Sequence, residues 1–304
     1  MIMYTKNGDN LRLNDEINLI DKLQFYMAKE MKEYNTSTLA KEFYIHKNKL
    51  LRITYTKLWE EFIFMDYEIM MNGNVKIGTY APDFEANTTM GPITLNQYKG
   101  KWVVLFSHPG DFTPVCTTEI IAFSKANPYF EQLNACLLGL SVDSNASHLA
   151  WIYDIYCKTG IRVPFPIIAD RNGAIARKYG MISNDVSTTE TVRNVFLIDE
   201  KGMVRLILVY PMNVGRCIPE ILRALNALQV ADSNKASTPA NWIPCQPVIL
   251  PPPQTFMALQ ERQKEIEKNQ NGMNWYLSFK NPKDCKITGD TECNRIEEDS
   301  KKTK

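Results

Sequence analysis

The sequence predicts an α/β fold, and three observations predict it. From residue 75 to residue 229, short apolar runs alternate with stretches in which apolar residues recur at helical spacing. The turn at residues 199–202, with the sequence DEKG, separates the last two apolar runs and places glycine where a hairpin needs unusual backbone angles. With 304 residues, the chain is long enough to bury a full core and to carry appendages.

Within this region the expected strands and helices follow one another along the chain. The apolar runs predict strands at residues 102–107, 136–142, 166–169, 194–199 and 203–210. The helical spacing predicts helices at residues 117–131, 147–159 and 173–179, with a closing helix at 218–228. Because a tight turn joins the last two strands, we expect them to pair antiparallel.

The two ends of the chain differ from this central region, which we assign to residues 75–230. Apolar positions at helical spacing between residues 14 and 70 predict two or three amphipathic helices, so residues 1–74 are expected to form a helical extension of unknown role. Residues 231–285 contain a linker-like stretch, three consecutive prolines and a charged helix at 254–269, and suit an arm that packs on another surface. Residues 286–304, rich in charge, are expected to be a disordered tail.

Composition excludes several classes of partner. Lysine and arginine together (35) nearly balance aspartate and glutamate (34), so nucleic acid and anionic membranes are not expected partners. No apolar run approaches the roughly 18 residues of a membrane-spanning helix, and charged residues interrupt the N-terminal stretch, so neither a membrane segment nor a secretory signal is expected. The seven cysteines are odd in number and lack the spacing of zinc sites, which favours the reducing cytoplasm. No bound metal or cofactor is expected.

One segment, VVLFSHPGDFTPVCTTE at residues 103–119, carries the chemistry. It is typical of an apolar strand, a turn with two prolines and the start of a helix, which places Cys116 in the first helical turn. There the unpaired backbone N–H groups and the positive end of the helix dipole favour a nucleophilic thiolate over a thiol. A cysteine at a helix start is more often a small buried residue, so the interpretation of Cys116 depends on its neighbours.

The neighbours of Cys116 suit a reaction with a peroxide. Thr113, three residues earlier, offers a hydroxyl to a bound peroxide, and Pro109 fixes the loop while presenting no N–H group. In isolation Thr113 would be an ordinary turn residue, and Arg193 a solvated charge on a strand edge. The residue before the first proline, His108, equally suits a buried histidine at the end of a strand.

The pattern Pro109-x-x-x-Thr113-x-x-Cys116 resembles the active-site motif of the peroxiredoxin family. The longer string SHPGDFTPVCTTE is similar to the one-cysteine, or peroxiredoxin VI, subfamily, and so are the flanking segments VKIGTYAPDFEANTTMGPITLNQYKGKW, TVRNVFLIDEKGMVRLILVYPMNVGR and ANWIPCQPVILPPP. The resemblance covers residues 75–270. It implies a thioredoxin-like fold for the central domain, with a C-terminal arm that packs across the partner of a homodimer or a higher homo-oligomer.

The resemblance also implies an activity, the reduction of hydrogen peroxide and alkyl hydroperoxides by a thiol-dependent peroxidase in antioxidant defence. Cys116 would attack the peroxide and become a sulfenic acid, Thr113 would hold the peroxide, and Arg193 would stabilise the thiolate and the charge that develops as the O–O bond breaks. Pro109 would shield the sulfenic acid from further oxidation. Supporting roles are implied for His108 and Arg216.

The remaining cysteines leave open how the sulfenic acid is reduced by thioredoxin, glutathione or a similar thiol. Relatives with a resolving cysteine carry it in the arm, close to the position that Ser278 occupies here, and this departure weakens a two-cysteine cycle. Cys285 and Cys293 lie a little further on and could act as resolving cysteines if the arm is mobile. The other cysteines are expected to pack, as at Cys136 and Cys157, or are assigned no role, as at Cys217 and Cys245.

Two other functions compete with the peroxidase. A thiol-disulfide oxidoreductase needs a Cys-x-x-Cys pair, whereas Thr117, Thr118 and Glu119 follow Cys116. An oxidant-sensing regulatory or interaction protein would act through its N-terminal helices, where residues 38–51 faintly resemble a helix-turn-helix that lacks the turn glycine. A helical hairpin that docks on another surface is the simpler interpretation of that extension.

Overall fold

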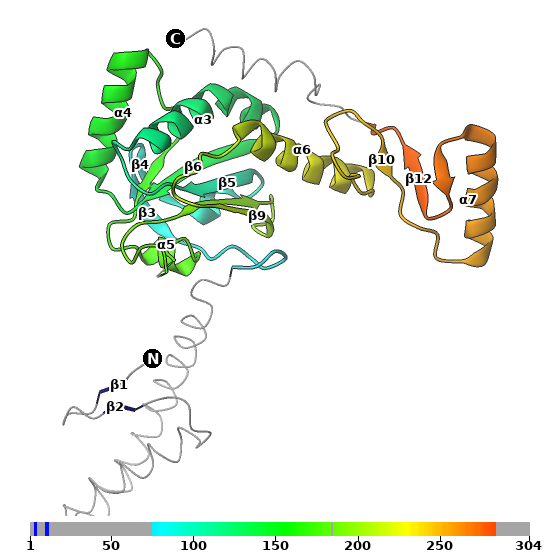
Figure 1. Ribbon diagram of the computed structural model, residues 1–304, viewed down its shortest axis with the longest axis horizontal. Helices are drawn as coiled ribbons and strands as arrows, with labels where there is room; N and C mark the ends of the chain where they lie inside the picture. Colours follow the sequence, from blue (N-terminus) through cyan, green and yellow to red (C-terminus); the bar gives the residue numbers. More distant parts are fainter. Residues whose placement is uncertain (1–2, 5–9, 12–74, 184, 284–304) are drawn as a thin grey trace, which may run out of the picture. The chain divides into compact units, whose positions relative to one another are not determined.

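The structure, a computed structural model, describes residues 3–4, 10–11, 75–183 and 185–283 (Figure 1). Near the N-terminus, β1 (Met3–Tyr4) pairs antiparallel with β2 (Asn10–Leu11). The helices expected between residues 14 and 70 and the expected tail at 286–304 lie outside the described residues. The domain boundaries therefore stay a prediction.

The central part of the chain forms a seven-stranded sheet with the strand order β4-β3-β7-β6-β5-β8-β9. Its strands are β3 (Glu85–Thr88), β4 (Gly91–Thr94), β5 (Trp102–Ser107), β6 (Ala135–Ser141), β7 (Ile167–Ala169), β8 (Arg193–Ile198) and β9 (Val204–Tyr210). The three central strands β5, β6 and β7 run parallel, and the others pair antiparallel. The expected α/β architecture is confirmed.

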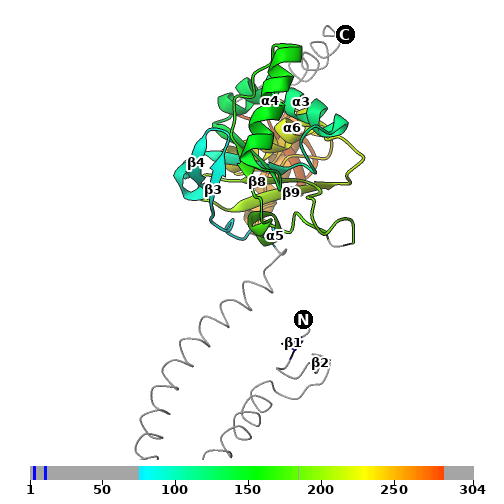
Figure 2. The ribbon, with the colours of Figure 1, turned by 90° about the vertical axis from the view of Figure 1, so that its left-hand side faces the viewer.

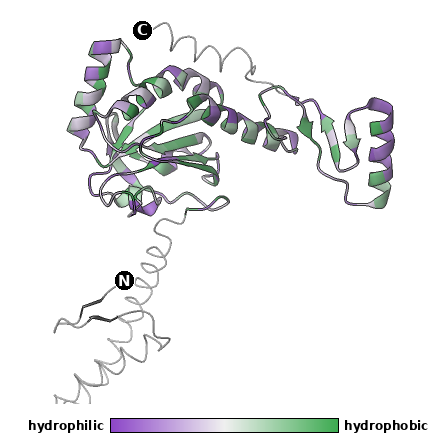
Figure 3. Cartoon of the chain, viewed as in Figure 1, coloured by the Kyte–Doolittle hydropathy of each residue, from purple (hydrophilic) through white to green (hydrophobic). Residues whose placement is uncertain are grey.

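Helices cover both faces of this sheet (Figure 2). They are α3 (Pro114–Gln132), α4 (Asn145–Thr159), α5 (Ala174–Lys178) and α6 (Ile218–Asn234), with a short 3-10 helix η2 (Leu95–Tyr98) after β4. Side chains alternate along β5, so that Val104 and Phe106 pack in one cluster with α3, α4 and α6, whereas Val103 and Leu105 pack in another with α5. The parallel strands β5, β6 and β7 are accordingly rich in apolar residues, while the helices show a mixture of polar and apolar positions (Figure 3).

The hairpin expected between the last two strands joins β8 to β9. Asp199 accepts hydrogen bonds on its side chain from the N–H groups of Lys201 and Met203, and Gly202 has φ +85°. Only glycine adopts that backbone angle without strain, so the position of the turn was readable from the sequence. The two strands pair antiparallel from Arg193↔Tyr210 to Ile198↔Val204, as expected.

Two differences from the expected elements have a clear physical reason. The hairpin of β3 and β4 was absent from the strands expected on apolar pattern, because its sequences EANT and GPIT carry too few apolar residues. The helix that closes the central domain, α6, runs six residues past the expected end at residue 228, because Val230 packs with Trp242 and Val248 in a small separate cluster. Because the residues around Val230 are polar, the spacing of apolar residues could not predict this extension of the helix.

The arm beyond α6 contains a small sheet and one helix. Its strands β10 (Val248–Ile249), β11 (Gly272–Asn274) and β12 (Leu277–Lys280) have the order β10-β12-β11, and α7 (Phe256–Asn269) packs beside β11 (Figure 1). The helix expected at 254–269 is thus confirmed to within two residues. Among the described residues no helix combines the length and the apolar character needed to cross a membrane.

Candidate active site

Cys116 lies in the first turn of α3, as the sequence predicts. Thr113 is the N-cap residue with extended backbone angles, and Pro114 is the first helical residue. Proline favours this position because its missing N–H would have had no partner there. The N–H groups of Val115 and Cys116 belong to the first turn and have no carbonyl of the helix one turn earlier, so the positive end of the helix dipole lies here. The side chain of Cys116 is 0% exposed.

A guanidinium group contacts the sulfur of Cys116. Arg193, at the start of β8, donates from Nη1 to the Cys116 Sγ at 3.2 Å. Its other edge is fixed by the carbonyl oxygen of Met212, which accepts from Nε at 2.9 Å and from Nη2 at 2.6 Å. Arg193 is buried, so the interpretation as a solvated charge is wrong. A positive charge in this position favours the thiolate over the thiol.

Glu119 binds both buried arginines. One of its carboxylate oxygens, Oε2, accepts from Arg193 Nη1 at 2.7 Å and from Arg216 Nη2 at 2.7 Å. The other, Oε1, accepts from Arg216 Nε and from the Arg216 backbone N–H, each at 2.8 Å. Two positive charges thus meet one negative charge inside the protein. One further negative charge at this position would make the buried group neutral.

Arg216 holds the elements of the site together. Its Nη1 donates to the carbonyl oxygens of Ser107, at the end of β5, and Asn194, at the start of β8, each at 2.9 Å. Its guanidinium carbon lies 5.2 Å from the ring centroid of Phe106 and 5.5 Å from that of Phe123, which is a cation–π geometry on two rings. Arg216 therefore joins β5, β8 and α3 at the edge of the sheet where Cys116 lies.

The electrostatics of Glu119 follow from these contacts. Burial alone would raise the pKa of Glu119, but the hydrogen bonds and charge of Arg216, with the charge of Arg193, outweigh burial and lower that pKa below its ordinary value. Burial lowers the pKa of Arg216, and Glu119 opposes this shift. The carboxylate is consequently ionised throughout the neutral range.

The loop between β5 and α3 carries the other predicted residues. Pro109 is buried, and Thr113 donates its hydroxyl proton to the carbonyl oxygen of Gly110 at 2.9 Å. Because that hydroxyl has one proton, its remaining capacity is to accept a hydrogen bond. Phe112, just before Thr113, has φ +55°, a left-handed angle that is uncommon outside glycine.

His108 lies at the end of β5 and is buried, so its ring is not solvated. Its Nε2 lies 3.1 Å from the Asp111 Oδ1, and its Nδ1 has no hydrogen-bond partner among the described residues. Burial lowers the pKa of His108, against an opposing effect of Asp111. Asp111 also contacts His148 of α4.

The structure brings together most of the predicted residues, and it adds several that the sequence analysis missed. Cys116, Arg193 and Arg216 are joined through Glu119, which lies three residues after Cys116 and therefore on the same helix face, a signal that the sequence did contain. The sequence contains no motif or residue spacing that would have predicted a role for His148. The possible resolving cysteines, Cys285 and Cys293, lie outside the described residues.

The arm position expected to carry a resolving cysteine is well defined. Ser278, on β12, is 0% exposed, and its hydroxyl accepts from Arg262 Nη1 at 2.7 Å. A buried serine bound to an arginine has a structural role here and no redox chemistry. The described part of the arm therefore offers no thiol at that position.

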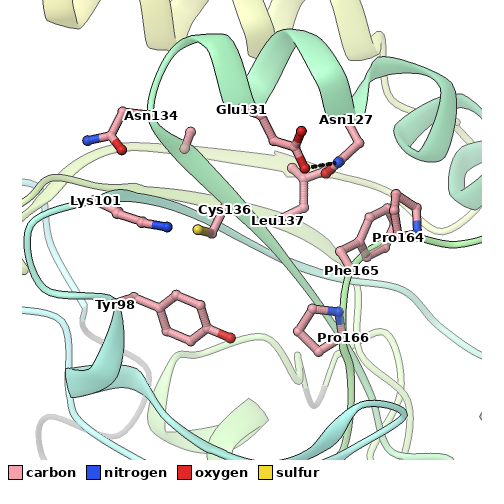
Figure 4. Close-up of a pocket in the computed structure, with 11 residues that line it drawn as sticks. Tyr98, Lys101, Asn127, Glu131, Asn134, Cys136, Leu137, Pro164, Phe165 and Pro166 are labelled. Carbon is pink, nitrogen blue, oxygen red and sulfur yellow. Dashed lines mark hydrogen bonds between the residues drawn. The ribbon is translucent and has the colours of Figure 1, made fainter.

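The other cysteines differ in exposure. Cys136, on β6, is half-buried, and its sulfur lies in a cavity of about 290 Å³ beside Lys101 and Tyr98 (Figure 4). Burial raises the pKa of Cys136, which Lys101 opposes. Cys157, on the outer face of α4, is exposed, so the expectation that it packs in the core was wrong. Helical spacing identified its helix but not the face on which it lies.

Two family models match the chain. The AhpC/TSA family matches residues 77–207, and the C-terminal domain of 1-Cys peroxiredoxin matches residues 227–265. Peroxiredoxin 2 of Caldanaerobacter subterraneus is 56% identical over 205 residues, which are 67% of this chain and 92% of that protein. The peroxiredoxin of Aquifex aeolicus is 48% identical over 217 residues, which are 67% of this chain and 96% of that protein.

Solved structures agree with these matches. A yeast mitochondrial 1-Cys peroxiredoxin is 40% identical with a TM-score of 0.57, over 68% of this chain and 99% of that one. A cysteine-to-serine mutant of Peroxiredoxin 6 from Arenicola marina is 33% identical with a TM-score of 0.61, over 69% of this chain and 100% of that one. The thioredoxin-like fold implied by the sequence is confirmed.

The buried carboxylate should make stability depend on pH. Because folding lowers the pKa of Glu119, its contribution to stability is present above the unfolded pKa of about 4.3 and is lost as the pH falls through the folded pKa. At neutral pH, Glu119→Gln should lower the free energy of unfolding by about 3–5 kcal/mol, since it leaves two arginines without their anion. Urea unfolding at several pH values measures this.

The matched control for this measurement is Glu265→Gln on α7, where the side chain is 65% exposed. This change should alter the free energy of unfolding by no more than about 0.5 kcal/mol. The difference in the free energy of unfolding between the wild type and Glu119→Gln should become smaller as the pH is lowered. A difference that is small at neutral pH, or that widens in acid, would contradict the account of Glu119.

Proposed function

The chain belongs to the peroxiredoxin family and is a thiol-dependent peroxidase, and from this premise we propose that Cys116 is the thiol that attacks the peroxide. The observation that carries the proposal is the 3.2 Å contact between Arg193 Nη1 and the Cys116 sulfur. Cys116, Cys136, Cys157 and Cys217 are free thiols, and in the described part of the chain Cys116 alone among these four accepts a hydrogen bond from an arginine. A cysteine beside a fixed cation at a helix start is a nucleophile at neutral pH.

In the proposed reaction, the Cys116 thiolate attacks the terminal oxygen of a hydroperoxide. A sulfur–oxygen bond forms and the O–O bond breaks; the attacked oxygen keeps its proton as the sulfenic acid hydroxyl, and the leaving oxygen takes a proton from water to become an alcohol or water. The products are a Cys116 sulfenic acid and the reduced peroxide. Arg193, which lies beside the sulfur, stabilises the negative charge as it moves from the sulfur to the leaving oxygen of the peroxide.

Two hydrogen-bonding groups would orient the peroxide. The Cys116 N–H has no helical partner, so it can donate to an oxygen of the peroxide. The Thr113 hydroxyl donates to Gly110, so it can accept the proton of the terminal oxygen. Together they would align the O–O bond with the sulfur.

The remaining site residues have supporting roles in this proposal. Pro109 is buried and has no N–H, so it would keep water and a second peroxide away from the sulfenic acid. Arg216 acts through Glu119 and holds β5, β8 and α3 in place. His108 lies next to Pro109, and its ring contacts Asp111 of the same loop.

A thiol reduces the sulfenic acid, and we propose a one-cysteine cycle in which an external thiol does so. The match to the 1-Cys C-terminal domain and the buried Ser278 support this cycle. The yeast mitochondrial relative is described as resolved by glutathione and thioredoxin systems, and we propose thioredoxin, glutathione or a similar thiol for this chain. Cys285 and Cys293 remain the candidates for a resolving cysteine.

Assembly and location complete the proposal. The match at residues 227–265 supports a homodimer or a higher homo-oligomer formed through the arm. The odd number of cysteines supports the cytoplasm. The near balance of charges favours neither nucleic acid nor a membrane as a partner. The contacts of Cys116 support the peroxidase, and none of them favours an oxidant sensor or a thiol-disulfide oxidoreductase over it.

Replacing the nucleophile should abolish turnover. Cys116→Ser should reduce peroxide consumption with dithiothreitol as reductant to the background rate, because a serine hydroxyl is not ionised at neutral pH. Cys157→Ser, which replaces an exposed cysteine, should keep the wild-type rate. Retained turnover in Cys116→Ser would rule out the assignment.

A one-cysteine cycle also predicts the behaviour of the C-terminal cysteines. The double variant Cys285→Ser/Cys293→Ser should keep its turnover with dithiothreitol or glutathione, because an external thiol reaches the sulfenic acid directly. After one equivalent of peroxide, non-reducing gels should show no disulfide that depends on Cys116. A Cys116-dependent dimer that vanishes in either single variant would instead identify a resolving cysteine.

A further inference from the structure

A buried carboxylate in the active-site loop contacts two histidines. The side chain of Asp111 is 1% exposed and lies between β5 and α3. Its Oδ1 is 3.1 Å from His108 Nε2, and its two oxygens are 3.0 and 2.8 Å from His148 Nδ1. His148 is on α4 and is 0% exposed. Three polar side chains are thus enclosed beside the nucleophile's loop.

The hydrogen-bond partners of His148 determine how many protons it carries. Its Nδ1 faces the Asp111 carboxylate, and its Nε2 lies 3.2 Å from the backbone carbonyl oxygen of Ile168 on β7. An ionised carboxylate and a carbonyl oxygen can only accept hydrogen bonds. A neutral imidazole has one N–H, so it would turn a lone pair toward one of these two oxygens. Both nitrogens must be protonated for both contacts to be hydrogen bonds.

The Asp111 carboxylate is ionised in this arrangement. Burial alone would raise the pKa of Asp111, but the hydrogen bonds from His108 and His148 outweigh burial and hold that pKa far below its ordinary value. The other charged groups nearby are Asp143, whose Oδ2 accepts from the Asp111 N–H at 3.0 Å, and Arg216, whose charge acts on His108. The negative charges of Asp111 and Asp143 favour a cation at His148.

We infer that His148 is an imidazolium that forms a buried ion pair with Asp111, and that this pair positions the β5–α3 loop for the reaction of Cys116. The inference rests on the proposed function of Cys116. Neither His148 nor Asp111 touches the reacting atoms, so each is a positioning residue. Their effect has to pass through the loop that carries Thr113.

The loop is fastened to α4 on both sides of the reacting residues. Before them, Asp111 binds His148; after them, Thr117 accepts from the indole N–H of Trp151 at 3.2 Å. His148 and Trp151 are three residues apart on α4 and therefore share one face of that helix. Thr113 and Cys116 lie between these two attachments, so loss of the first would release the peroxide-holding side of the loop.

The ion pair also fixes the tautomer of His108. Asp111 can only accept, so His108 must carry its proton on Nε2, which leaves the Nδ1 lone pair buried without a partner among the described residues. A bound cation is the alternative, because one ligand atom from each of the three residues lies within 4.8 Å of the others. A cation would replace the proton on His148 Nδ1, so the two states exclude each other.

Nitrogen chemical shifts of the histidine rings test the proton count directly in the wild-type protein. The chain has three histidines, so spectra of His46→Gln and His148→Gln assign the signals. At pH of about 8 a free imidazole, with a pKa of about 6.5, is neutral. We expect His148 to show two protonated nitrogens there. A single protonated nitrogen, or about one metal ion per chain by elemental analysis, would overturn the inference.

Kinetics test the positioning role. His148→Gln should lower kcat/KM for the peroxide about tenfold or more, because the loop no longer holds the reactant in line. The kcat at saturating peroxide, where reduction by dithiothreitol limits the rate, should stay near the wild-type value. Asp154→Asn, which changes an exposed carboxylate of α4, should alter neither.

The split between these two constants separates positioning from loss of folded protein. A variant that only misfolds would lower kcat and kcat/KM by the same factor, and that outcome, or an unchanged kcat/KM, would refute the positioning role. The double variant Asp111→Asn/His148→Gln should lower kcat/KM by no more than the more damaging of the two single variants, since both residues act through one pair. Turnover by Cys116→Ser would indicate failure of the proposed function instead, without affecting the ring-nitrogen result.

Discussion

The site depends on one buried carboxylate, Glu119, held between two guanidinium groups. Removing three charges from water is costly, and only close hydrogen bonds on every face of the group offset that cost. Here Glu119 receives such bonds from Arg193 and Arg216 at 2.7–2.8 Å, but the charges do not cancel. The excess positive charge of Arg193 lies beside the sulfur of Cys116, where it favours a negative charge.

The fold delivers these groups to one edge of the sheet. Strand β5 ends at Ser107, and β8, which pairs with it antiparallel, begins there with Arg193. Helix α3 starts just beyond the end of β5 and brings Cys116 and Glu119 on one face. The part of the loop before Cys116 is held by the contact between Asp111 and His148 of α4. Two buried polar groups, one on each side of Cys116, therefore hold this part of the fold in place.

Local features of the sequence predicted the local parts of this site. Capping and helix-start chemistry placed Cys116 in the first turn of α3, and a glycine turn placed the β8–β9 hairpin. The role of Arg193 came only from the family resemblance, because it lies 77 residues from Cys116 and meets it only through the register of β8 against β5. His148 was missed for the same reason. The spacing of apolar residues predicts which face of a helix or strand is buried, but it does not predict which other element that face contacts.

The central claim is that the charge of Arg193 keeps Cys116 ionised. The ultraviolet absorbance of the thiolate at neutral pH tests it directly, taken as the difference between each protein and the same protein with Cys116→Ser. We predict a signal close to one thiolate per chain in the wild type and the loss of most of it in Arg193→Met, where Glu119 and Arg216 neutralise each other. An equal thiolate signal with and without Arg193 would contradict the account.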